Sequence, residues 1–189
     1  SVTRLEEKID ALPPGSNGLL VLPGLTGERA PYWKEYLTGT ITGLTPDHKS
    51  QHFLRAVMEG CVLRMLRMLD ILSQDRLPAK ALNVVGGGAN IDVWNRIRSD
   101  VSGLEVRKLA VTEATSLGTA LFCKAGLDKS RSLKEIAREW LKVDKRFSPD
   151  NKHTRVYKQL ARRFEAQIQF YSDVYQAQTK ILKKKAKTY

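Results

Sequence analysis

The alternation of apolar and polar positions predicts short strands and helices that follow one another along the chain. Short apolar runs bounded by glycine or proline, typical of buried strands, occupy residues 18–22, 40–44 and 80–85, and residues 105–109 alternate as a strand does. Apolar residues recur at helical spacing over 91–101, 114–125 and 132–141. Because strand and helix alternate with short connections after residue 80, we expect an α/β fold with a short, mostly parallel sheet flanked by helices.

Two longer helices are predicted. Thr45 and Pro46 are suited to the N-cap and first turn of a helix over 47–73, whose wide apolar surface indicates packing on more than one side. A long C-terminal helix is predicted over 151–181, with apolar residues at intervals of three and four. We therefore divide the chain into a domain over 1–150 and a C-terminal helix with a basic tail over 151–189.

The net charge of +12 is concentrated in the C-terminal third. Residues 1–119 contain 14 Lys and Arg against 13 Asp and Glu, and residues 120–189 contain 18 against 7. A basic segment binds nucleic acid in some proteins and is a solvated helix face in more of them. The aromatic residues of this segment fall mostly on one helical face suited to packing, and no recognition motif accompanies them. Nucleic-acid binding is therefore the weaker interpretation.

The cysteine and histidine residues give no sign of a disulfide framework or a metal site. Cys61 and Cys123 lie in apolar, helix-like segments, and none of the three histidines pairs with cysteine at metal-ligand spacing. The sequence has no signal-peptide pattern and no apolar run long enough to span a membrane. We expect a soluble, cytoplasmic protein with no membrane partner and no bound metal of its own.

The most informative local feature is the segment Val-Val-Gly86-Gly87-Gly88-Ala-Asn90, in which a strand ends in three glycines before a helix. Glycines allow a ligand to approach the backbone, and the helix N-terminus offers free amide groups, so a nucleotide is a natural occupant. A tight connection without a ligand is the alternative. The segment is not a dinucleotide fingerprint, because Ile91 stands where a third spaced glycine is required, and no Gly-Lys-Ser or Gly-Lys-Thr of a Walker A loop follows.

Two other segments have the composition of a site or an interface. The loop over 23–33 is long and contains charged and aromatic residues. The segment Glu113-Ala-Thr-Ser-Leu-Gly118 precedes a helix with small residues, which suit either close helix packing or a flat base.

Four motifs in order resemble the FGGY family of carbohydrate kinases, notably its xylulose and gluconate kinases. Residues 39–44 and, seven residues later, His52-Phe-Leu-Arg-Ala-Val-Met-Glu59 are similar to the second family signature. Residues 18–33 resemble the loop that precedes this signature, and residues 86–100 and 113–118 resemble the adenosine-binding segments. The resemblance covers residues 18–125 and is looser beyond residue 147.

The resemblance implies part of an actin-like, ribonuclease H-like ATPase fold, in which two domains close on ATP and a sugar. It assigns Gly86, Gly87, Gly88 and Asn90 to the adenosine or the neighbouring phosphates and brings Asn95 toward the base.

The resemblance also indicates residues at the edge of the nucleotide cleft. It places Glu59 and Gly60 near the cleft, at the end of the signature. Glu28 and Arg29 would order the loop at the cleft edge, with a structural ion pair as the alternative.

The family's catalytic parts are expected outside this chain. In these kinases an aspartate deprotonates a sugar hydroxyl, which attacks the γ-phosphate of ATP with Mg²⁺ present. The segment with that aspartate and the sugar-binding domain are not found in the sequence, so no catalytic or metal-binding residue is assigned. Asp47, Asp70, Asp92 and Asp100 are expected to cap helices or face solvent.

These expectations describe the C-terminal, ATP-binding portion of a sugar kinase. We expect the isolated chain to be inactive, to bind ATP or ADP weakly at best, to meet a sugar only with the missing domain, and to self-associate as a homodimer through an uncovered edge. A noncatalytic, actin-like interaction module is the remaining alternative.

Overall fold

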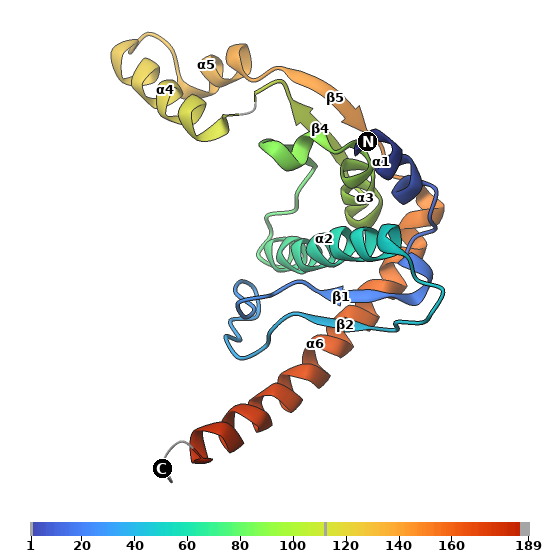
Figure 1. Ribbon diagram of the computed structural model, residues 1–189. Helices are drawn as coiled ribbons and strands as arrows, with labels where there is room; N and C mark the ends of the chain where they lie inside the picture. Colours follow the sequence, from blue (N-terminus) through green and yellow to red (C-terminus); the bar gives the residue numbers. More distant parts are fainter. Residues whose placement is uncertain (1, 112, 186–189) are drawn as a thin grey trace.

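The computed structural model describes residues 2–111 and 113–185, which form an α/β fold with a long C-terminal helix (Figure 1). In chain order the elements are α1 (Val2–Asp10), a 3-10 turn (Ser16–Gly18), β1 (Leu20–Leu22), β2 (Thr40–Thr42), α2 (Ser50–Gln74), β3 (Ala81–Val84), a second 3-10 turn (Gly87–Asn90), α3 (Asp92–Ser102), β4 (Glu105–Leu109), α4 (Ala114–Leu127), α5 (Leu133–Trp140), β5 (Val143–Phe147) and α6 (Asn151–Lys185). The α/β class and the long final helix are therefore confirmed.

The described strands form two small sheets, and their pairing is more mixed than we expected. β1 and β2 are antiparallel, whereas the second sheet has the order β3-β4-β5, with β3 parallel and β5 antiparallel to β4. Only one of the three pairs is parallel, so the expectation of a mostly parallel sheet is corrected. The sequence did not reveal β5 because Phe147 is its one buried residue, which leaves no alternation of apolar and polar positions.

The core lies where α2, α3 and α6 meet β1 and α1. Figure 1 shows α2 in the middle of the molecule, between the β1–β2 pair and α3, with α6 crossing both layers. From α6 the core takes Tyr157, Phe164 and Ile168, all buried. The apolar face of α6 therefore packs within this chain. The boundary at residue 150 coincides with the start of α6, but both segments share one core.

The start of α2 differs from the prediction. The helix begins at Ser50, and the Lys49 amide donates to His52 Nδ1 at 2.9 Å. Thr45 and Pro46 begin a turn instead, in which the Thr45 amide donates to His48 Nδ1 at 2.9 Å. Two histidine side chains thus accept hydrogen bonds from the backbone amides before α2, whereas we expected Thr45 to cap this helix.

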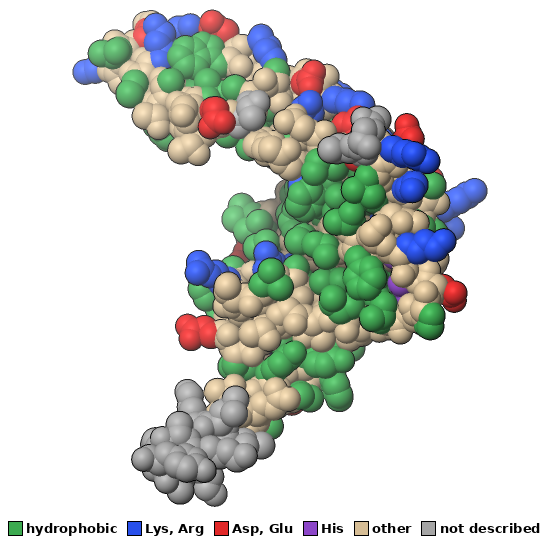
Figure 2. Space-filling view, in the orientation of Figure 1, with side chains coloured by type: hydrophobic (Ala, Val, Ile, Leu, Met, Phe, Trp, Pro, Cys, Tyr) green, Lys and Arg blue, Asp and Glu red, His purple; other side chains and the backbone are tan. Residues whose placement is uncertain are grey.

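Helices α4 and α5 pack on each other and extend from the rest of the molecule as an arm (Figure 1). Figure 2 shows the molecule hollowed between this arm and the part that contains α2. Phe122 and Leu127 of α4 are exposed, and a Cβ at Gly118 would meet none of the described atoms within 4 Å. Close helix packing is therefore not the role of Gly118 in the described structure.

Candidate functional site

A cavity of about 220 Å³ lies at the carboxyl ends of β3 and β4. In open α/β sheets, ligands usually bind at the carboxyl ends of the parallel strands. The cavity is lined by Gly86, Ala89, Asn90, Lys108, Leu109, Ala110, Val111 and Asp144. Of the predicted nucleotide residues, Gly86 and Asn90 are thus brought to its wall, and Gly87 and Gly88 lie in the turn between them.

The glycine turn leaves its backbone open on one side. Gly86 has φ 79° and ψ −178°, a conformation that residues with a Cβ rarely adopt. A Cβ at Gly86 or at Gly87 would meet none of the described atoms within 4 Å. The amide of Ala89 donates to the Gly86 carbonyl at 3.0 Å, and α3 begins two residues after Asn90. The turn therefore offers unobstructed backbone next to the positive end of a helix.

Asn95 holds this turn from behind. Its side chain is 0% exposed, and its Nδ2 donates to the Ala89 carbonyl at 2.8 Å. Its Oδ1 accepts from Arg98 Nη1 at 2.6 Å, and the same nitrogen donates to the Gly88 carbonyl at 3.2 Å. The Arg98 guanidinium stacks 4.2 Å from the centre of the Trp94 ring. Burial lowers the pKa of Arg98. The buried Asn95 side chain therefore positions the turn, and its approach to the base stays a prediction.

Lys108 and Asp144 supply the charged groups of the cavity wall. Lys108 Nζ lies 2.9 Å from Asp144 Oδ2, and the two residues belong to the neighbouring strands β4 and β5. Neither residue was predicted from the sequence. Lys108 is an ordinary polar position in an alternating strand, and Asp144 lies in the strand that the pattern did not predict.

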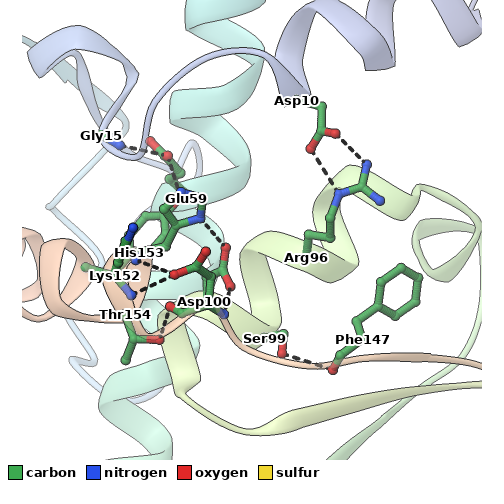
Figure 3. Close-up of polar contacts among 12 residues, drawn as sticks. Asp10, Gly15, Glu59, Arg96, Ser99, Asp100, Phe147, Lys152, His153 and Thr154 are labelled. Carbon is green, nitrogen blue, oxygen red and sulfur yellow. Dashed lines mark hydrogen bonds and ion pairs between the residues drawn. The ribbon is translucent and has the colours of Figure 1, made fainter.

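Glu59 lies in the interior, at the centre of a hydrogen-bonded cluster (Figure 3). Its Oε1 accepts from the Gly15 amide at 2.9 Å, from Arg55 Nε at 2.9 Å and from the Tyr157 hydroxyl at 2.7 Å. Its Oε2 accepts from the Ser16 hydroxyl at 2.9 Å. Burial and the neighbouring carboxylate raise the pKa of Tyr157. Glu59 thus joins α2 to the loop after α1 and to α6.

Gly60 marks a close approach of α2 to β1. A Cβ at this position would clash with the carbonyl oxygen of Val21. Neither Glu59 nor Gly60 lines the cavity at the glycine turn, and the contacts described for both are structural. Their place near the nucleotide cleft stays a prediction.

Glu28 is buried and pairs with α2. It is 1% exposed, and its Oε2 lies 3.3 Å from Arg64 Nη1. Glu28 thus makes a structural ion pair, and its partner is Arg64 of α2. Glu28 also exchanges two backbone hydrogen bonds with Lys34, at 3.0 and 2.8 Å, which closes the tip of the loop.

Arg29 lies at that tip, in the wall of a separate hollow of about 710 Å³ that also includes Trp33. The loop is tied to α6, because the Tyr32 hydroxyl donates to Glu165 at 2.5 Å and the Tyr36 hydroxyl lies 3.1 Å from Ser172 Oγ. The hollow beside Arg29 shares no lining residue with the cavity at the glycine turn.

The aspartates set aside above have structural partners or face solvent. Asp100 Oδ1 accepts from the Asp150 amide at 2.8 Å, and its Oδ2 lies 2.9 Å from His153 Nδ1, which fixes the start of α6 (Figure 3). Asp92 pairs with Lys145 at 2.5 Å, whereas Asp47 and Asp70 are exposed. Among the described residues, no three His, Cys, Asp or Glu side chains are grouped so that they could hold a metal ion.

Two further observations bear on the alternatives. No helix in the described part of the chain is long and apolar enough to cross a membrane. Of the aromatic side chains of α6 that a nucleic-acid interface could use, Tyr157 and Phe164 are buried in the core, whereas Phe170 is exposed.

An α/β chain with a glycine turn at the carboxyl ends of parallel strands resembles the broad class of nucleotide-binding folds. Comparison with known proteins identifies the family. The model of the FGGY family of carbohydrate kinases, C-terminal domain, matches residues 3–127. The chain therefore belongs to the FGGY family of carbohydrate kinases.

Individual relatives agree with this assignment. The chain is 30% identical over 160 residues to xylulose kinase of Bacillus subtilis, covering 85% of this chain and 32% of that protein. It is 34% identical over 141 residues to glycerol kinase of Alkaliphilus metalliredigens, covering 74% and 28%.

Solved structures show the same fold. Xylulose kinase from Rhodospirillum rubrum superposes with a TM-score of 0.81 at 25% identity, over 93% of this chain and 35% of that one. Gluconate kinase from Lactobacillus acidophilus gives 0.83 at 23% identity, over 94% and 36%. The actin-like fold is thus confirmed, and the chain spans about a third of the length of these relatives. Neither the interaction-module nor the nucleic-acid alternative is supported.

Proposed function

We propose that this chain is the ATP-binding portion of a kinase that transfers the γ-phosphoryl group of ATP to a hydroxyl of a sugar or sugar acid. The observation that carries the proposal is the open glycine turn at the cavity beside β3 and β4, in a chain of the FGGY family. We assign Gly86, Gly87, Gly88 and Asn90 to the nucleotide.

The geometry suits an anionic ligand that approaches the backbone. No described atom lies where a Cβ of Gly86 or Gly87 would point, so phosphate oxygens can reach the amide groups there. Asn95 and Arg98 fix the carbonyl groups of the turn from the far side. A turn that is already rigid loses little conformational entropy when the ligand binds.

In the proposed reaction the sugar hydroxyl oxygen forms a bond to the γ-phosphorus, and the bond from that phosphorus to the β–γ bridging oxygen breaks. ADP leaves with the electron pair, and the hydroxyl proton passes to an aspartate outside this chain. Phosphoryl transfer depends mainly on positioning and charge stabilisation. The described residues of this chain contribute the positioning, because they hold the nucleotide.

Mg²⁺ is expected to arrive with the nucleotide. The described residues contain no group of acids, histidines or cysteines that would hold a metal by themselves. Mg²⁺ in such enzymes keeps several waters and is bound through substrate phosphates and one or two carboxylates. We therefore assign no residue of this chain to the metal.

The acceptor is proposed to be a small polyhydroxy compound of the kind named in the relatives, which are xylulose, gluconate and glycerol kinases. We propose that its contacts come from a part of the protein outside this chain. A cytoplasmic location is proposed as well, since Cys61 and Cys123 are both unpaired, which suits a reducing compartment.

The proposal is tested with radiolabelled ATP and three acceptors, xylulose, gluconate and glycerol. We expect no labelled product from the isolated chain and labelled product from a longer protein that includes the sugar-binding domain. In that protein Gly87→Val should raise the KM for ATP and leave the KM for the acceptor unchanged. Valine is compatible with the backbone of Gly87, which has no positive φ, and its side chain would enter the open space. Sugar phosphorylation by the isolated chain, or a rise in the acceptor KM alone, would contradict the proposal.

A further inference from the structure

An irregularity in β5 directs Asp144 toward the cavity at the glycine turn. In the pairing of β4 with β5, Lys108 lies opposite Lys145 and Leu109 lies opposite Val143, so Asp144 has no partner residue across the ladder. An extra residue of this kind bends the strand and redirects its side chain, and such bulges are frequent beside active sites. Here the redirected carboxylate lines the cavity.

The partner of Asp144 is fixed by the parallel pair of strands. Lys108 is in register with Val84 of β3, two residues before Gly86. The ammonium group therefore lies near the point where the glycine turn begins, and it pairs with Asp144 at 2.9 Å. Neither group is fully buried, with side-chain exposures of 22% for Lys108 and 50% for Asp144. Together they are the only ionisable groups among the described residues that line the cavity.

The charged groups that line the cavity indicate where the phosphates of a nucleotide would lie and where its neutral part would lie. Asp144 is neutralised by Lys108, so this wall has no net attraction for phosphate, whereas the amide groups of the glycine turn and the start of α3 attract it. The volume of about 220 Å³ is smaller than the ~300–1,000 Å³ typical of pockets for whole drug-sized ligands, so it suits only part of a nucleotide. Asp144 is therefore placed for a neutral part of the nucleotide that donates hydrogen bonds.

We propose that Asp144 accepts hydrogen bonds from the ribose hydroxyls of the bound nucleotide and that Lys108 is a positioning residue that holds this carboxylate. The inference rests on the proposed function, since it requires that a nucleotide occupies the cavity. A carboxylate that accepts from a hydroxyl makes a charge-assisted hydrogen bond, which is stronger than a neutral one. Because the lysine and the aspartate neutralise each other, the pair adds hydrogen bonding with no net attraction for a triphosphate.

The test compares ATP with 2′,3′-dideoxy-ATP, which lacks both hydroxyls. Dissociation constants are measured by amide NMR titration of the chain, which follows weak binding. We expect the unaltered chain to prefer ATP by about tenfold, the loss expected for one charge-assisted hydrogen bond. In Asp144→Ala the preference should fall to about one, and in Asp144→Asn it should be intermediate, because the amide oxygen still accepts. The ratio of the two constants is informative even where a freed Lys108 attracts the triphosphate more strongly, since that attraction acts on both nucleotides.

Glu105→Gln is the matched control. Glu105 is at the other end of β4, pairs with Arg146 of β5 at 2.8 Å and does not line the cavity. This variant removes one carboxylate from the same two strands and should keep the tenfold preference. Circular dichroism checks that each variant is folded.

The outcomes separate the two proposals. If the unaltered chain binds both nucleotides equally, or if Asp144→Ala keeps the preference for ATP, the ribose inference is rejected while nucleotide binding stands. If neither nucleotide shifts the amides of residues 86–90, nucleotide binding by this chain is rejected, and the inference is rejected with it.

Discussion

Replacing Glu59 by glutamine removes the one carboxylate that ties α2 to the loop after α1 and to α6. Four donors converge on it, from Gly15, Ser16, Arg55 and Tyr157. A glutamine oxygen cannot serve all four, and its amide group brings further donors to a place that needs acceptors. Arg55, 4% exposed, would also be left buried without a counter-charge.

The expected loss is large relative to the stability of a domain. Breaking a buried ion pair by removing one partner costs about 3–5 kcal/mol. Domains of this size unfold with about 5–15 kcal/mol, so Glu59→Gln should remove a large fraction of the free energy of unfolding. Tyr157→Phe deletes one donor to Glu59 and one acceptor for Arg55 Nη2, and should cost about 1–3 kcal/mol.

Urea unfolding followed by circular dichroism measures these differences. The control is Asp10→Asn, which breaks the exposed pair of Asp10 with Arg96, each side chain 44% exposed (Figure 3). Exposed pairs contribute about 0–1 kcal/mol. The joint variant Arg55→Met with Glu59→Leu should lose less than Glu59→Gln, because it leaves no unpaired charge. A loss for Glu59→Gln no larger than that for Asp10→Asn would refute the structural role of this cluster.

Four other predictions follow from the described contacts. Gly60→Ala should destabilise the chain strongly in urea unfolding, because the added Cβ would clash with β1. Gly118→Ala in α4 should stabilise the chain by about 0.5–1 kcal/mol, because the added Cβ would have open space. Asn95→Ala should cost about 1–3 kcal/mol in urea and weaken ATP binding in an NMR titration, since a buried carbonyl of the glycine turn loses its donor. A hydrogen bond from the Lys152 amide, at the start of α6, lowers the pKa of Asp150 in the folded chain, so the ionised carboxylate stabilises the fold. This stabilisation is complete above pH ~4 and is lost as pH falls through the lower folded pKa. Asp150→Ala should therefore lower the urea midpoint at pH ~7 and leave it unchanged at strongly acidic pH. β3 is one of the two edge strands of its sheet in the described structure, so light scattering should show a dimer at high concentration, and a strict monomer would contradict this.

The glycine turn and the order of most elements could be predicted because their signals are local. Three glycines after an apolar run specify a strand end, an open backbone and a helix start within seven residues. The core face of α6 was also readable, because its apolar residues recur at helical spacing in sequence.

The roles of individual polar residues could not be predicted, because they depend on contacts between distant segments. Asn95 looked like a ligand residue, and only the folded chain shows its amide turned toward the Ala89 carbonyl. Glu59 is 44 positions from Gly15 and 98 from Tyr157. Asp144 lies in a strand held mainly by backbone pairing with β4, which leaves no pattern of side chains to detect.

The central claim, that the glycine turn binds a nucleotide, is tested most directly by an amide NMR titration of the chain with ATP at two salt concentrations. We predict saturable shifts at residues 86–90 and 108–111 that persist at the higher salt and are abolished by Gly87→Val. Shifts confined to the basic helix α6 that disappear at the higher salt, or no saturable shift at the glycine turn, would contradict the claim.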